Sequence, residues 1–138
     1  MVLQASDLKK YSYFSTLSDG SLAVLCRKLT LVTYPAGTEI IEEGRTGDFF
    51  YFVKEGRLEM TKRSKSGQEA KLSVVGSGHG FGEMALLTCS IRACSVHAVT
   101  AVVLYRLAKR DFENIVLHEA AFKSMLVRKA QDFSTITG

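Results

Sequence analysis

Short runs of β-branched and aromatic residues fill the middle of this chain, from residue 29 to residue 107. The runs read LTLVTY, TEIIEE, DFFYFV, RLEMTK, AKLSVV, CSVHAV and VVLYRL. Such residues are enriched in β-strands, and the segments between the runs are rich in glycine and serine, which favour turns. About eight short strands at this spacing, interrupted by one helical segment, predict an eight-stranded antiparallel β-roll of jelly-roll type.

Helical patterns lie on both sides of the predicted roll. In residues 1–28 leucines recur at helical spacing, and Ser18 stands where an N-cap residue is favoured. In residues 108–138 two apolar stripes at helical spacing, which include Phe112 and Phe122, predict C-terminal helices. We therefore expect a single domain over the 138 residues, with helices at both ends of the roll.

Composition excludes several classes of function. The three cysteines, Cys26, Cys89 and Cys94, are odd in number and form no close pair, so we expect reduced thiols in the cytoplasm and neither zinc nor disulfides. No apolar run approaches the ~20 residues of a membrane helix, and no signal peptide opens the chain. The net charge of +4 is scattered, so we expect no direct contact with nucleic acid or membrane.

The segment FGEMALLTCSIRACSV, residues 81–96, follows a glycine-spaced run and holds an acid and an arginine beside an apolar stretch. A helix that starts near Gly82 would point free backbone N–H groups at a phosphate. Arg92 could bind two oxygens of the same phosphate, while Glu83 could accept hydrogen bonds from hydroxyl groups. These chemistries together describe a site for a sugar phosphate.

A second interpretation of the same residues needs no ligand. A glutamate near a helix N-terminus complements the helix dipole, and an arginine at the start of a strand is commonly a solvated surface residue. The spacing of the two charges alone leaves both interpretations open. A short helix of Ala, Leu and Met that interrupts a β-roll favours the ligand site.

Residues 81–96 resemble the phosphate-binding cassette of the cyclic nucleotide-binding domain family, whose pattern is approximately F-G-E-(L/M)-A-L-(L/I)-x-x-x-x-R-(A/T)-A-(S/T)-V. The resemblance continues upstream in PAGTEIIEEGRTGDFFYFVKEGRLEM, which places four glycines at the turns of the family's first strands: Gly37, Gly44, Gly47 and Gly56. It covers nearly the whole chain. It implies a β-roll with an inserted cassette helix and a ligand that is a cyclic nucleotide.

The resemblance also implies roles for individual residues of the cassette. Glu83 would accept the ribose 2′-hydroxyl, and Arg92 would pair with the exocyclic oxygens of the cyclic phosphate. Gly82 would contact the ribose through its backbone, and the amides of Ala85 and Ala93 would complete the phosphate cradle. The implied ligand-binding set is Gly82, Glu83, Met84, Ala85, Arg92, Ala93 and Cys94. Met84 is also expected to pack the cassette helix against the C-terminal helices.

Other positions concern selectivity and closure of the site. A threonine directly after the arginine often accompanies a preference for cyclic GMP in this family, so Ala93 favours cyclic AMP over cyclic GMP. The C-terminal helices would serve as hinge and lid, with Phe133 as the candidate that covers the base. Two departures from the family pattern are Arg45, where many members carry an acid, and Ile91, where many carry proline.

The predicted function is that of a regulatory domain and not of an enzyme. No nucleophile–base pair or metal-ligand cluster is visible, because the histidines are isolated from one another. The partners implied are a cyclic nucleotide, an output domain outside this chain (kinase, channel, exchange factor or DNA-binding domain) and a second copy in a homo-oligomer. No cofactor is expected. The alternative is a nucleotide-independent roll that contacts other proteins.

Overall fold

The computed structural model describes residues 4–42, 44, 48–81 and 94–137, with residues 116–117 and 129–137 as backbone only. The N-terminal elements are α1 (Ala5–Lys9), the 3-10 helix η1 (Ser12–Phe14) and α2 (Asp19–Lys28). The strands are β1 (Thr30–Tyr34), β2 (Glu39–Ile41), β3 (Phe49–Glu55), β4 (Leu58–Arg63), β5 (Glu69–Val75), β6 (Gly80–Phe81), β7 (Ser95–Ala98) and β8 (Val102–Ala108). Two helices follow, α4 (Lys109–His118) and α5 (Ala120–Thr137).

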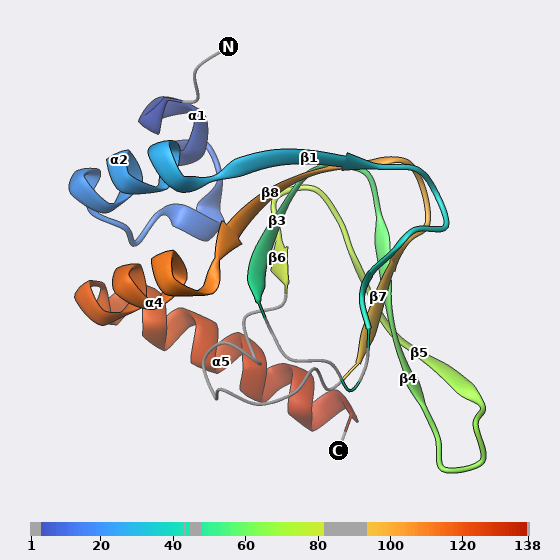
Figure 1. Ribbon diagram of the computed structural model, residues 1–138. Helices are drawn as coiled ribbons and strands as arrows, with labels where there is room; N and C mark the ends of the chain where they lie inside the picture. Colours follow the sequence, from blue (N-terminus) through green and yellow to red (C-terminus); the bar gives the residue numbers. More distant parts are fainter. Residues whose placement is uncertain (1–3, 43, 45–47, 82–93, 138) are drawn as a thin grey trace.

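The strands form two antiparallel four-stranded sheets, in the order β1-β8-β3-β6 and β2-β7-β4-β5. The predicted β-roll with helices at both ends is therefore confirmed (Figure 1). β6 was not among the predicted strands, because its glycine-rich surroundings are typical of a turn. It forms through pairing with β3, where Phe81 lies opposite Tyr51 and Gly80 opposite Phe52.

β3 explains why the run DFFYFV is apolar at consecutive positions. Phe50 and Phe52 pack against the helices on one face of the sheet, and Tyr51 and Val53 point between the two sheets. A strand buried on both faces needs no alternation of apolar and polar residues. The prediction that this run is a strand is confirmed, and its central residues belong to the core.

The core has two parts, one between the sheets and one between the first sheet and the helices. The buried residues between the sheets are Ile41, Tyr51, Val53, Leu58, Val75, Phe81, Val96, Ala98, Val102 and Leu104. The buried residues under the helices are Leu8, Tyr13, Phe14, Leu17, Leu22, Leu25, Phe50, Phe52, Tyr105, Leu107, Phe112, Ile115, Phe122 and Leu126. Figure 1 shows the N-terminal helices and α4–α5 together on one side of the roll. None of the helices that the structure describes is long and apolar enough to span a membrane.

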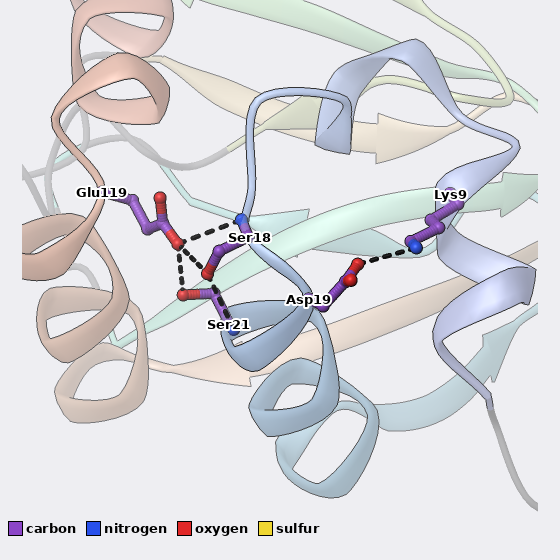
Figure 2. Close-up of polar contacts among 5 residues, drawn as sticks. All are labelled: Lys9, Ser18, Asp19, Ser21 and Glu119. Atoms are coloured by element: carbon purple, nitrogen blue, oxygen red, sulfur yellow. Dashed lines mark hydrogen bonds and ion pairs between the residues drawn. The ribbon is translucent and has the colours of Figure 1, made fainter.

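Glu119, the single residue between α4 and α5, joins the C-terminal helices to the start of α2 (Figure 2). Its Oε1 accepts hydrogen bonds from Ser18 Oγ and Ser21 Oγ, both at 2.6 Å, and from the Ser18 backbone N at 3.1 Å. The predicted N-cap is also present, since Ser18 Oγ accepts a hydrogen bond from Ser21 N at 3.2 Å. A carboxylate at a helix N-terminus is further favoured by the helix dipole.

Replacing Glu119 by glutamine should make the stability of the fold less dependent on pH. Hydrogen bonds from Ser18 and then Ser21, helped by the charge of His118, lower the pKa of the Glu119 carboxyl in the folded chain. The carboxylate therefore stabilises the fold fully above the unfolded pKa, about 4.3, and this contribution is lost as pH falls through the lower folded pKa. We expect Glu119→Gln to cost about 1 kcal/mol near neutral pH and less in acid. Urea denaturation from about pH 3 to pH 7 measures this difference, and an equal cost at every pH would contradict it.

Candidate functional site

Most of the predicted ligand-binding residues belong to the segment 82–93. Gly82, Glu83, Met84, Ala85, Arg92 and Ala93 lie outside the described residues, as do Arg45 and Ile91. Cys94, the last member of the set, is buried with 8% of its surface exposed. Phe133 belongs to α5, where it is described as backbone only. The structure therefore defines the surroundings of the candidate site: the strands at its two ends and the helix expected to cover it.

The segment 82–93 connects the two sheets of the roll. It follows β6, which is the edge strand of one sheet, and precedes β7, which lies between β2 and β4 in the other sheet. Phe81 at one end and Val96 near the other are both buried between the sheets. The two ends of the segment are thus anchored on different sheets.

The upstream anchor is held by close aromatic packing. The Phe81 ring stacks on the Tyr51 ring with centroids 5.1 Å apart and an interplanar angle of 12°. The backbone before it is tied to β3, because Val53 N donates to His79 O and Gly78 N donates to Val53 O, both at 2.9 Å. The chain therefore reaches Gly82 from a fixed position.

Gly80 lies where no side chain fits. A Cβ atom at this position would be 2.6 Å from both Phe50 Cζ and Tyr13 Oη. Both rings are buried, so neither can move away without displacing its own neighbours. Gly80, the residue directly before the cassette, is therefore required for the packing of η1 on β3 and β6.

Substitution of Gly80 by alanine should destabilise the fold by about 1–3 kcal/mol, because the added methyl group overpacks a closed aromatic cluster. Gly76→Ala is the matched control, since no atom lies within 4 Å of a Cβ built there. Urea denaturation of the two variants beside the wild type gives the comparison. Equal stability of the two variants would mean that the contacts around Gly80 are looser than described.

Tyr13 connects the upstream anchor to the C-terminal helices. Its ring lies beside Gly80 and contacts the Phe122 ring of α5, with centroids 6.0 Å apart at an interplanar angle of 78°. Phe122 is 3% exposed, which confirms that its apolar stripe is buried, and Met125 packs against the same cluster. The sequence gives no signal for Tyr13 as a link between Gly80 and Phe122, because these three residues are far apart along the chain.

His97 lies on a strand and pairs with an acidic side chain. His97 on β7 lies with Glu59 on the outer face of the second sheet, 3.4 Å between His97 Nε2 and Glu59 Oε2. Glu59 also pairs with Lys71 at 2.9 Å, and this contact is the main cause of the lowered pKa of the Glu59 carboxyl. His97 is therefore a strand residue that faces away from the core between the sheets. Within the described parts of the chain, no three His, Cys, Asp or Glu side chains are grouped to hold a metal ion.

The comparisons with known proteins agree with this fold. The family model described as "Cyclic nucleotide-binding domain" matches residues 31–119. A cAMP-dependent protein kinase regulatory subunit from Aspergillus fumigatus is 36% identical over 109 residues, which make up 79% of this chain and 26% of that protein. The chain therefore spans about a quarter of the length of that relative.

Two solved structures are similar over 90% of this chain and 44% of theirs, with 27% sequence identity and a TM-score of 0.83. One is the regulatory subunit of a cAMP-independent protein kinase A from Trypanosoma brucei. The other is a variant of that subunit bound to cAMP in its A site. The variant carries an introduced alanine, an arginine seven positions later, and a second alanine directly after the arginine. Ala85, Arg92 and Ala93 have the same spacing in this chain.

Proposed function

Because the chain belongs to the cyclic nucleotide-binding domain family, we propose that it binds a cyclic nucleotide, with cyclic AMP preferred over cyclic GMP. Glu83 accepts the ribose 2′-hydroxyl, Arg92 pairs with the cyclic phosphate, and the amides of Ala85 and Ala93 complete the phosphate contacts. The observation that carries the proposal is the intact cassette sequence. Its alanine, followed seven positions later by the pair Arg-Ala, has the same spacing as the residues introduced in the cAMP-bound variant. The anchored strands at both ends of the segment support it further.

We propose that this domain regulates and does not catalyse. Residues 1–138 form one domain, and movement of α4 and α5 transmits ligand binding to an output domain outside this chain. The regulatory subunits among its relatives favour a protein kinase catalytic subunit as that partner, ahead of a channel, an exchange factor or a DNA-binding domain. The domain is cytoplasmic, and its parent protein can be a homo-oligomer. No cofactor takes part other than the bound nucleotide.

Calorimetric titration of the purified chain with cyclic AMP and with cyclic GMP tests the proposal. We expect saturable binding of both, with a lower dissociation constant for cyclic AMP. If neither nucleotide binds at concentrations up to about 1 mM, where even a weak interaction of about −4 kcal/mol is detectable, the proposed function is wrong.

The second candidate function is a nucleotide-independent roll that contacts other proteins. The observation in its favour is the similarity to the cAMP-independent kinase subunit of T. brucei. Arg45, which stands where many members of the family carry an acid, also favours this second function. The titration separates the two candidates, because a nucleotide-independent domain releases no heat with either nucleotide.

Replacing Ala93 by threonine should improve the binding of cyclic GMP. The added hydroxyl group would accept a hydrogen bond from the purine amino group, which cyclic AMP lacks at that position. One such bond contributes about 0.5–1.5 kcal/mol, so cyclic GMP affinity should rise by roughly two- to ten-fold relative to cyclic AMP. Ala93→Val, which adds similar bulk without a hydroxyl, is the control. An unchanged ratio of the two affinities in Ala93→Thr would refute this role.

A further inference from the structure

Glu119 contributes to the starts of two helices at once. Its backbone O accepts a hydrogen bond from Lys123 N at 3.0 Å, in the first turn of α5. Its side chain accepts the three hydrogen bonds from Ser18 and Ser21 at the start of α2 (Figure 2). These residues are about a hundred positions apart in sequence, so the bonds form only when the start of α5 lies against the start of α2.

The two C-terminal helices are attached to different parts of the domain. α4 is held on the first sheet, because Lys109 N donates to Asp48 O at 3.0 Å and the Phe112 ring stacks on Phe50 with centroids 5.2 Å apart. α5 instead packs on η1, where the Phe122 ring contacts the Phe14 ring at 6.4 Å. Glu119 therefore lies at the joint between a helix fixed on the sheet and a helix fixed on the N-terminal segment.

α5 is long enough to amplify a small change at this joint. Phe133 lies fourteen residues after Glu119, which is about 21 Å along a helix. A rotation of about 10° at the joint would displace the helix axis at that point by roughly 4 Å. Figure 1 shows α5 running from the end of α4 below β3 and β6 in this view. The direction of α5 at its start thus decides where its second half lies.

We infer that Glu119 is a positioning residue, which holds α5 in the arrangement that binds the cyclic nucleotide. The inference rests on the proposed function. The hydrogen bonds from Ser18 and Ser21 stabilise this arrangement over any in which α5 has moved away. A ligand that is contacted by α5 binds less tightly when that arrangement is less populated, so loss of these bonds lowers its affinity.

Glu119→Gln tests the inference, because it keeps the shape of the side chain and removes the charge that the three donors share. We expect cyclic AMP to bind about three- to ten-fold more weakly by calorimetry, from loss of charge-assisted hydrogen bonds. Hydrogen–deuterium exchange of the α5 amides, residues 120–128, should be faster without ligand and return to wild-type protection at saturating cyclic AMP. Unchanged or tighter binding would overturn the inference.

Two further variants separate this role from a general effect on helix stability. Asp19→Asn is the matched control, because Asp19 lies at the same helix start and pairs with Lys9 at 2.7 Å. It should leave the affinity within about twofold of wild type, which is under 0.5 kcal/mol. The double variant Ser18→Ala with Ser21→Ala should weaken binding, and adding Glu119→Gln to it should weaken it no further.

A weakening by Asp19→Asn that equals that of Glu119→Gln would overturn the inference, and so would additive losses in the combined variant. The proposed function itself is tested with the wild-type chain and not with these variants. If the wild-type chain binds neither nucleotide, the proposed function is wrong. If the wild type binds cyclic AMP and Glu119→Gln binds it equally well, only the role of Glu119 is wrong.

Discussion

Arg92→Ala is expected to weaken cyclic AMP binding by about thirty-fold to several thousand-fold. The proposed partner of Arg92 is the cyclic phosphate, an anion that gives up its water on entering the site. Truncating the arginine would leave that charge desolvated and unpaired, which costs about 2–5 kcal/mol. At about 1.4 kcal/mol for each factor of ten, this range gives the expected loss. Calorimetric titration of the variant beside the wild type measures it.

Arg92→Lys is the matched control for this prediction. A lysine keeps the positive charge but cannot bind two phosphate oxygens with one planar group. We therefore expect an affinity between those of the wild type and Arg92→Ala. Thermal unfolding without ligand should show that all three proteins are folded. Wild-type affinity in Arg92→Ala would remove Arg92 from the site and would favour the nucleotide-independent function.

The strands and helices of this fold could be predicted from the sequence because each carries a local pattern. The runs of β-branched and aromatic residues became β1–β5, β7 and β8. The serine at position 18 caps α2 as its residue type favours. β6 could not be predicted in this way, because Gly80 and Phe81 become a strand only through their pairing with β3.

The candidate site was predicted differently, from the resemblance of one sixteen-residue segment to a family pattern. Most of the residues concerned lie outside those that the structure describes, so their roles remain predictions. The contacts that surround the site were not predictable. Tyr13 contacts Gly80 and Phe122 only after the chain has folded. The same holds for the hydrogen bonds that Glu119 accepts from Ser18 and Ser21. No local pattern marks contacts between residues this far apart in sequence.

Gly56 is a position where we expect a single added methyl group to disrupt the roll. Its φ is +97°, in a region that residues with a side chain avoid at a cost of about 1–2 kcal/mol. A Cβ atom there would lie 2.5 Å from the backbone O of Ala101 and 2.7 Å from Val102 Cγ1. Gly56 lies between β3 and β4, so the clash would force this turn away from the start of β8.

The backbone that Gly56 faces cannot move freely, because the two turns are tied together. Arg57 N donates a hydrogen bond to Thr100 Oγ1 at 3.1 Å, and Val99 N donates to Arg57 O at 2.9 Å. Overpacking against fixed neighbours costs a further 1–3 kcal/mol or so. We therefore expect Gly56→Ala to destabilise the fold by about 2–5 kcal/mol, which urea denaturation measures.

Gly37→Ala separates the two causes of this loss. Gly37 also has a positive φ, +89°, but no atom lies within 4 Å of a Cβ built there. It should therefore show the backbone cost alone, about 1–2 kcal/mol. The difference between the two variants is then the steric cost of the contact between the turns. If Gly56→Ala were no less stable than Gly37→Ala, the close approach of Gly56 to Ala101 would not exist in solution.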